Sequence, residues 1–280
     1  FPLARPVTAR HIHWRESCSG ARPSSDGRAV LAVIPARLGA TRLPRKPLRL
    51  LGGIPLVVRV WQSVMEMGVA TRCVVATDSD EVATAVRAAG AECIMTRTDH
   101  QSGTDRVAEV ASRPDFSRYD AIVNVQGDEP FVQRAAVAGA AELVTSGRFP
   151  LGTAAAPAGD DVLQQPQVVK VVTADDGRAM YFSRAGIPFR RDGGGVALTP
   201  PLVRQHVGVY AYTRDALARW VALPPHPLEC VEKLEQLRPL AAGIPMGVAL
   251  VPVAPLGGID TEDDLARASA YWDDFRRGRA

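Results

Sequence analysis

From residue 29 onward, apolar runs of strand length alternate with longer stretches suited to helices. The runs are rich in Val, Ile, Leu and Ala, a pattern typical of strands buried on both faces of a parallel sheet. The runs cover 29–37, 71–78, 91–96 and 119–128, and the predicted helices cover 55–67, 80–90, 104–112 and 134–147. This order predicts an open α/β sheet with right-handed crossovers.

After Pro150 the alternation gives way to strand-like runs with few helices between them, at 152–158, 168–175 and 204–213. Such a run of strands predicts an antiparallel or mixed excursion attached to the same sheet. The expected fold is therefore α/β: an open, mixed, mostly parallel sheet flanked by helices, with a smaller antiparallel excursion. Residues 30–280 are expected to form one domain.

The last part of the chain predicts an amphipathic helix over 229–243, a strand over 247–253 and a closing helix over 260–277. Asp260 or Thr261 would cap the closing helix, with acidic residues in its first turn and arginines near its end.

The composition excludes several classes of protein. A net charge of +3 is too small to indicate nucleic-acid binding, and no apolar stretch reaches membrane-spanning length. The four cysteines show no metal-binding or redox spacing, so we expect free thiols in a reducing compartment such as the bacterial cytoplasm.

Residues 1–29 lack hydrophobic periodicity and are rich in arginine. The first thirty residues contain five arginines but only two acidic residues, Glu16 and Asp26. This composition suits an organelle-targeting peptide, but a misread upstream start or a disordered tail explains it equally well. We keep this extension apart from the predicted domain.

Polar residues of ligand type follow four consecutive predicted strands. The first strand is followed by Arg37, Arg42, Arg45 and Lys46, and the others by Thr77-Asp78, by DHQSGTDR and by QGDEP at 126–130. Ligands of open α/β sheets bind beyond the carboxyl ends of the strands, and a basic loop near a helix start suits a polyphosphate.

Lys46 is one of only three lysines, beside thirty arginines, which favours a specific role over an ordinary solvated basic loop. A polyphosphate usually requires Mg²⁺, for which Asp128 and Asp260 are the candidate ligands. Helix capping by Asp260 and turn chemistry at 126–130 remain the alternative interpretations.

The chain resembles the 3-deoxy-manno-octulosonate (Kdo) cytidylyltransferases in nine motifs, which stand in register over 29–268. These are VIPARxxxTRLPxKPL (33–48), VVATD (74–78), MTxxDHxSGTDRxAEV (95–110), VNVQGDEP (123–130), VVKVV (168–172), YFSRxxIPF (181–189), HVGVYAY (206–212), LExVExLEQLR (228–238) and GIDTEDDL (258–265). The resemblance implies a Rossmann-like nucleotidyltransferase fold, Mg²⁺ dependence and a homodimer. It also implies that 166–216 serve sugar binding and dimerisation.

By motif, the resemblance implies CTP and Kdo as substrates. The CTP side would comprise Ala36, Arg37, Arg42, Lys46, Thr77, Ser102 and Arg106, and the metal ligands would be Asp128 and Asp260. The sugar side would comprise Gln126, Arg184, His206, Tyr210, Glu232 and Gln236, with Arg184 on the sugar carboxylate. Arg37, Lys46, Asp128 and Asp260 would carry catalysis. Arg45 departs from the glycine of many relatives, and Cys230 from an amide residue.

Several of these roles have a structural alternative. Arg106 also suits a helix-face ion pair, Arg184 a structural arginine, and His206 a satisfied core histidine. Glu232 and Gln236, four residues apart, are expected on one helix face, although their neighbours could make the sugar contacts instead.

The expected reaction is attack of the sugar's anomeric hydroxyl on the α-phosphorus of CTP, driven mainly by positioning and charge neutralisation. Three rivals differ in kind. One is cytidylyl transfer to another acidic sugar, such as 8-amino-Kdo, sialic or legionaminic acid. The second is a non-catalytic nucleotide-binding module. The third is a dinucleotide-dependent redox enzyme, which the lack of GxGxxG after the first strand disfavours.

Overall fold

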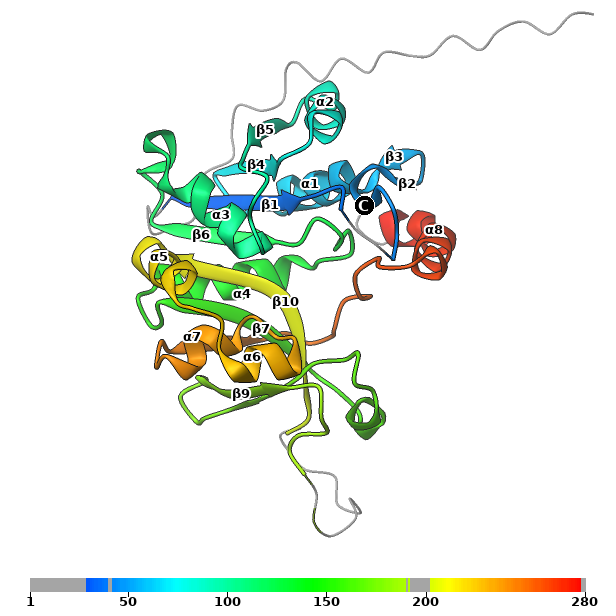
Figure 1. Cartoon of the computed structure of the whole chain (residues 1–280). Coiled ribbons are helices and arrows are strands. Elements are labelled where there is room, and N and C mark those ends of the chain that lie inside the picture. Colours follow the sequence, from blue (N-terminus) through cyan, green and yellow to red (C-terminus); the bar gives the residue numbers. More distant parts are fainter. Residues whose placement is uncertain (1–28, 40–41, 190, 192–201, 278–280) are drawn as a thin grey trace, which may run out of the picture.

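A seven-stranded path forms the centre of the molecule, in the order β11-β7-β10-β6-β1-β4-β5 (Figure 1). In this computed structural model the described residues are 29–39, 42–189, 191 and 202–277. The strands are β1 (Val30–Ala36), β4 (Arg72–Thr77), β5 (Glu92–Met95), β6 (Ala121–Val125), β7 (Leu151–Pro157), β10 (Arg204–Thr213) and β11 (Met246–Leu250). Residues 1–28, which hold nearly all of the predicted extension, lie outside the described part.

The sheet is mixed, as predicted. β1 pairs in parallel with β4 and β6, β4 with β5, and β7 with β11, whereas β10 runs antiparallel to both β6 and β7. Of the three strands predicted for the excursion, β7 and β10 lie in the central path, and only β8 (Lys170–Thr173) lies off it. There β8 forms a hairpin with β9 (Ala179–Ser183), which joins the sheet through a pairing of β8 with β10. The expected fold class is confirmed.

Helices cover both faces of the sheet because successive residues of a strand point to opposite faces. On β1, Ala32 and Ile34 belong to an apolar cluster that also contains residues of α1 (Leu56–Met67), α2 (Asp80–Ala88) and α4 (Arg134–Thr145). Leu31 and Val33 belong to a second cluster on the other face, with residues of α3 (Gly103–Ser112), α5 (Arg214–Ala222) and α7 (Leu237–Ala241). Burial on both faces explains the unbroken apolar run of β1.

The last helix, α8 (Glu262–Arg277), lies at one end of the sheet beside the short hairpin of β2 (Leu50–Leu51) and β3 (Ile54–Pro55), as Figure 1 shows. Trp272 of α8 packs in a third apolar cluster with Leu51 and Phe131. Thr261, rather than Asp260, caps α8: its hydroxyl accepts the Asp264 N–H at 3.1 Å, and Asp264 accepts the Thr261 N–H at 2.9 Å. The Asp260 carboxylate is thereby left for other contacts.

The continuous helix expected over 229–243 is wrong. Two short helices, α6 (Pro227–Glu232) and α7, are separated by Lys233 in a left-handed conformation with φ of 53°. Pro239 explains the break, because in an unbroken helix its ring would clash with the carbonyl four residues earlier. Glu232 and Gln236 therefore do not share one helix face. The helix α5 and the strand β9 were not among the predicted elements.

Candidate active site

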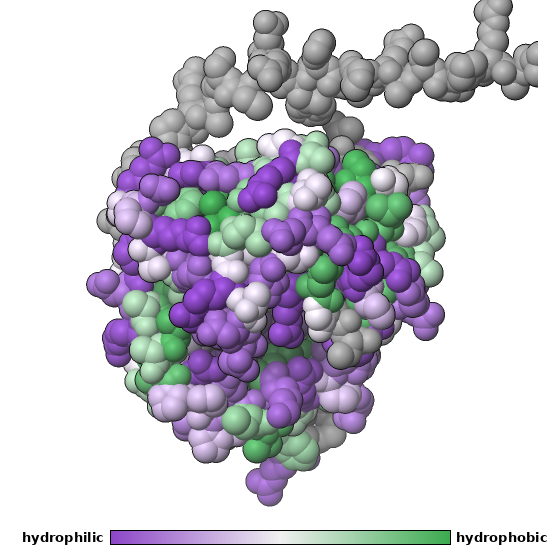
Figure 2. All heavy atoms as spheres, turned by 45° about the horizontal axis from the view of Figure 1, so that its top comes forward, coloured by the Kyte–Doolittle hydropathy of each residue, from purple (hydrophilic) through white to green (hydrophobic). Residues whose placement is uncertain are grey.

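A polar pocket of about 430 Å³ opens at the carboxyl ends of β1 and β6, where ligands of open α/β sheets bind. Figure 2 shows one face of the molecule, on which hydrophilic residues surround a recess. Nine of the predicted site residues line the pocket: Ala36, Arg37, Arg42, Lys46, Ser102, Arg106, Gln126, Asp128 and Asp260. Four of the nine are cationic and two are anionic, so the pocket suits a polyanion.

Glycines bring the walls of the pocket together. A side chain at Gly127 would place its Cβ 2.7 Å from the carbonyl oxygen of Pro35, at the end of β1. At Gly258 a Cβ would meet a carboxylate oxygen of Glu129 at 3.0 Å. The close approach of Gly258 to Glu129 is stabilised by a hydrogen bond of 3.0 Å from the Ile259 N–H to the Asp128 carbonyl. The loop that carries Asp260 is therefore fixed directly onto the end of β6.

Lys46 joins the two predicted metal ligands. Its ammonium donates to Oδ2 of Asp128 and, at 2.7 Å, to Oδ1 of Asp260. Because both oxygens lie within hydrogen-bond reach of one nitrogen, they are no more than roughly 6 Å apart. Asp128 and Asp260 thus converge on one position, as expected for a shared cation.

The charges in this cluster support one another. Burial opposes ionisation of Lys46, but Asp128 and Asp260 outweigh it and raise the pKa of the ammonium. For Asp260 burial also opposes ionisation, yet Lys46 and Arg42, whose Nη2 lies 2.9 Å from Oδ2, lower the pKa. Glu129 follows Asp128 in the sequence. Burial, and then repulsion from Asp128, raise the pKa of Glu129 to about 8. Asp260 and Lys46 are therefore charged at neutral pH, whereas Glu129 is largely protonated.

Arg37 and Arg42 are exposed beside the cluster, where they can reach a bound anion. Arg45 is different, because its guanidinium pairs with Glu81 on α2 and it does not line the pocket. Arg45 has φ of 57°, in the left-handed region that glycine adopts most readily. This conformation explains why a glycine suits the position.

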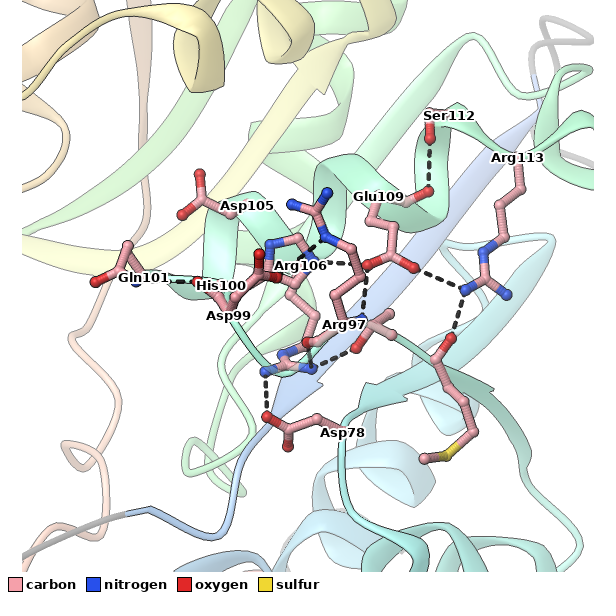
Figure 3. Close-up of polar contacts among 12 residues, drawn as sticks. Asp78, Arg97, Asp99, His100, Gln101, Asp105, Arg106, Glu109, Ser112 and Arg113 are labelled. Carbon is pink, nitrogen blue, oxygen red and sulfur yellow. Dashed lines mark hydrogen bonds and ion pairs between the residues drawn. The ribbon is translucent and has the colours of Figure 1, made fainter.

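The far end of the pocket is built from the loop after β5 and the start of α3. Ser102 caps α3 in a capping box with Asp105. Arg106 is buried, and its guanidinium donates to Asp78 at 2.9 Å, to the Thr96 hydroxyl and to the Arg97 carbonyl at 3.3 Å. Figure 3 shows this arginine pointing from α3 toward Asp78. Arg106 therefore both forms an ion pair with Asp78 and lines the pocket.

The predicted residue Thr77 does not line the pocket. Its side chain is fully buried, and its hydroxyl accepts the Ser79 N–H at 3.2 Å. Thr77 therefore shapes the turn after β4.

The remaining sugar-side residues form a second polar group outside the pocket: Arg184, His206, Tyr210, Glu232 and Gln236. The two groups are joined by a 3.0 Å hydrogen bond from the Thr104 hydroxyl, next to the pocket, to Glu235, which precedes Gln236. Gln126 likewise lies 3.4 Å from Asn124, which binds the Tyr212 hydroxyl at 3.3 Å. The second group is therefore adjacent to the pocket.

Arg184 is held by main-chain carbonyls. Its guanidinium donates to Glu232 O at 2.7 Å, Pro166 O at 3.1 Å and Lys233 O at 3.4 Å. The Glu232 carboxylate in turn accepts the Arg184 N–H at 2.9 Å and the Ser183 hydroxyl at 2.6 Å. In this geometry Arg184 and Glu232 fasten α6 to the end of β9, so an added sugar contact would use the remaining donors of Arg184.

His206 and Tyr210 lie in an aromatic row. The His206 ring packs edge-on against Phe182, with 5.0 Å between the ring centroids, and tilted against Tyr210 at 5.5 Å. Its Nε2 lies 2.9 Å from the Thr153 hydroxyl. Burial lowers the pKa of His206 to about 4, so the ring is neutral at physiological pH. This environment resembles that of a satisfied core histidine.

Among the lining residues that were not predicted, His100 alone has a titratable side chain. Its Nε2 lies 2.6 Å from Oε2 of Glu109, and the residue lines the pocket. The signal was present, because His100 belongs to the polar run DHQSGTDR after the third predicted strand.

Comparisons with known proteins point to one family. A family model described as cytidylyltransferase matches residues 31–246. A 3-deoxy-manno-octulosonate cytidylyltransferase of Gemmatimonas aurantiaca is 67% identical over 87% of this chain and 94% of its own length. One of Herminiimonas arsenicoxydans is 46% identical over 86% of this chain and 97% of its own length.

A solved structure of CMP:2-keto-3-deoxy-manno-octonic acid synthetase in complex with CTP matches with a TM-score of 0.81. It is 36% identical, and the match covers 88% of this chain and 99% of that one.

Proposed function

Because this chain belongs to the cytidylyltransferase family, we propose that it transfers CMP from CTP to the anomeric hydroxyl of 3-deoxy-manno-octulosonate and releases pyrophosphate. The similar enzymes carry this substrate in their names, and one matching structure holds CTP. The observation that carries the proposal is the convergence of Asp128 and Asp260 on Lys46 in a cationic pocket.

The cationic side chains of the pocket would bind the triphosphate. Arg37 and Arg42 are exposed at the pocket and can fold over a bound anion, whereas Lys46 is mostly buried beside Asp128 and Asp260. Fixed positive charge near the phosphates stabilises the charge that develops as pyrophosphate leaves. Ala36, Ser102 and Arg106 would bound the nucleoside part of the pocket.

Mg²⁺ fits the donor set of the site. Asp128 and Asp260 offer carboxylate oxygens, the ligands this ion prefers, and their shared position already holds a cation, the Lys46 ammonium. The described residues contain no cluster of three or more His, Cys, Asp or Glu side chains, so water and phosphate oxygens would complete the coordination. When bound, Mg²⁺ would polarise the phosphate and acidify the attacking hydroxyl.

The protein's own part in the reaction is positioning. Lys46 and the two arginines would hold the triphosphate against β1, while Gln126 faces the side of the pocket nearest the second polar group. An acceptor bound there would approach the α-phosphorus from the side opposite to the departing pyrophosphate. Asp128 and Asp260 would keep their charge and their place throughout.

The acidic sugar would bind between the pocket and the second polar group. Arg184, His206, Tyr210, Glu232 and Gln236 lie on β9, β10 and the segment from α6 to α7. The links through Thr104 and Asn124 favour this placement. Another acidic sugar, such as 8-amino-Kdo, sialic or legionaminic acid, remains the alternative acceptor.

A homodimer is part of the proposal. Among the described residues β9 pairs only with β8, and Met180 on β9 is 61% exposed. Phe189 and Val231 are also largely exposed apolar residues. Such edges and apolar side chains are typical of surfaces that a second copy covers. Light scattering over a range of protein concentrations tests this assignment, and a monomer at all of them would contradict it.

The product would serve lipopolysaccharide or cell-wall polysaccharide synthesis, and we place the enzyme in the cytoplasm. Free Cys73 and Cys93 support a reducing compartment. No helix among the described residues has the length and apolar character needed to cross a membrane.

The decisive experiment is CMP-sugar formation by the purified full chain with CTP and a panel of acidic sugars, with and without Mg²⁺. We expect the highest kcat/KM for Kdo and loss of turnover when the metal is chelated. Preference for another sugar would reassign the acceptor. Failure to release pyrophosphate with any sugar would refute the proposed activity.

A further inference from the structure

His100 presents an uncommitted ring nitrogen at the nucleoside end of the pocket. The residue stands in the loop between β5 and α3, lines the pocket, and has a side chain only 6% exposed. Its Nε2 lies 2.6 Å from Glu109, whereas no described residue hydrogen-bonds its Nδ1. A polar atom without a protein partner at a pocket wall is a candidate ligand contact.

Glu109 fixes the orientation of this ring. The carboxylate also accepts the Arg97 N–H at 2.9 Å and Nη2 of Arg113 at 2.9 Å, and Figure 3 shows it reaching from α3 toward all three donors. Burial opposes its ionisation, but these hydrogen bonds lower the pKa of Glu109 to about 2. Glu109 is therefore ionised at every physiological pH and acts only as an acceptor.

The hydrogen bond to Glu109 determines which nitrogen of His100 is protonated. Because Glu109 can only accept, Nε2 must carry the hydrogen. In the neutral ring Nδ1 then holds a lone pair and accepts a hydrogen bond. The pocket wall thus offers an oriented acceptor.

The neighbouring polar groups are already engaged. Arg106 donates to Asp78, Thr96 and Arg97, and the Ser102 hydroxyl accepts the Asp105 N–H at 3.1 Å. Arg106 has no acceptor atom at all. His100 is therefore the side chain at this end of the pocket best placed to accept a hydrogen bond from a nucleoside.

We propose that His100 is a nucleotide-contacting residue, whose Nδ1 accepts a hydrogen bond from the cytidine part of CTP, and that Glu109 is its positioning residue. This assignment rests on the proposed function for its choice of nucleotide. Cytidine offers two kinds of donor, the exocyclic amino group of the base and the ribose hydroxyls. UTP has a carbonyl in place of that amino group, and dCTP lacks the 2′-hydroxyl, so the two analogues distinguish the donors.

Two substitutions separate the two ring nitrogens. His100→Gln places an amide near Nε2, which keeps the contact with Glu109 and removes the acceptor at Nδ1. His100→Asn places an amide oxygen near Nδ1, which keeps the acceptor and loses the contact with Glu109. The two variants therefore differ in the contact that the proposal assigns to the ligand.

The experiment measures the Kd of CTP, UTP and dCTP by calorimetry, and kcat/KM for each, on the wild type and both variants. We expect His100→Gln to raise the Kd of CTP roughly tenfold. One of two ratios, the Kd of UTP to that of CTP or the Kd of dCTP to that of CTP, should fall by a similar factor. In His100→Asn the same ratio should stay closer to its wild-type value than in His100→Gln. Each ratio is taken on a single preparation, so incomplete folding of a variant does not affect it.

Unchanged ratios in His100→Gln, with only a lower Tm, would overturn the proposal, because a purely structural histidine affects all nucleotides alike. If the wild type binds CTP but makes no CMP-sugar, the proposed function fails while the calorimetric test of His100 stands. If only the ratios stay unchanged, the role of His100 fails and the function stands.

Discussion

Asp128 and Asp260 share one counterion, the ammonium of Lys46, although they come from opposite halves of the chain. The carboxylates are brought together by the hydrogen bond between Ile259 and Asp128 and by the close approach that Gly258 allows. Lys46 is thus placed where an incoming divalent cation would compete for the same oxygens. The first two predictions follow from this arrangement.

Replacing Lys46 by methionine should increase the stabilisation that Mg²⁺ gives. Without the ammonium the two carboxylates repel each other, and a metal no longer has to displace a cation. Thermal unfolding should show a larger rise of Tm on adding Mg²⁺ to Lys46→Met than to the wild type, even though turnover falls. Lys46→Arg, which keeps a cation, is the control. Equal shifts in all three proteins would argue against a shared metal position.

Asp128→Asn and Asp260→Asn should each lower kcat by about 100-fold or more, the scale of losing one preorganised electrostatic contact. Asp263→Asn is a matched control, since this carboxylate is exposed on the first turn of α8 and does not line the pocket. Pyrophosphate release at saturating Mg²⁺ measures the effect. Near-normal turnover of either pocket variant would remove that aspartate from the active site.

Arg184→Ala separates two roles of one residue. Its contacts with three carbonyls predict a loss of stability of about 1–3 kcal/mol, because those acceptors lose their donor. A direct sugar contact predicts in addition a higher KM for the acidic sugar with the KM for CTP unchanged. Urea unfolding and steady-state kinetics measure the two effects separately. An altered KM for CTP alone would contradict our division of the site into two parts.

His206 should make the fold sensitive to acid. Its pKa is about 4 in the folded protein, against an ordinary value of 6.5, so between these pH values the unfolded chain binds the extra proton. Stability should therefore fall as the pH is lowered from 6.5 to 4, by up to roughly 3 kcal/mol from this residue. In His206→Gln this part of the slope should vanish. A variant that keeps the full wild-type slope in urea titrations would assign the effect to other groups.

Arg45→Gly should be more stable than Arg45→Ala by roughly 1 kcal/mol, because only glycine adopts the left-handed conformation of this position without strain. Both variants lose the exposed contact with Glu81, so that contact cancels in the comparison. Urea unfolding gives the difference. If alanine proves equally stable, the conformation at Arg45 is not strained.

The sequence was most informative where burial imposes a pattern. Strand β1 is buried on both faces and reads as an uninterrupted apolar run, so its position and its parallel neighbours could be predicted. The amphipathic pattern over 229–243 was misleading because apolar spacing outweighed Pro239, which is tolerated in the first turn of a helix such as α7 but not in the interior of a longer one. Short elements such as β9 gave too few residues for a period to stand out.

In the candidate site, nine of the predicted residues line one pocket, and six of these nine are charged. The surroundings of Arg184 could not be predicted, since its partners are main-chain carbonyls, which every residue possesses. Lys170 is similar: this fully buried ammonium binds the carbonyls of Gln165, Val168 and Arg184. Partners of this kind become visible only when the backbone is in place.

The fastening of residue 259 onto residue 128 also sets an order of events during synthesis. A nascent chain emerging from the ribosome contains the basic loop and Asp128 well before Asp260 has been made. Until then Lys46 has only one acidic partner, and chemistry that needs both carboxylates cannot begin. Premature termination between residues 128 and 260 would therefore leave a fragment that contains the basic loop and Asp128 but lacks Asp260.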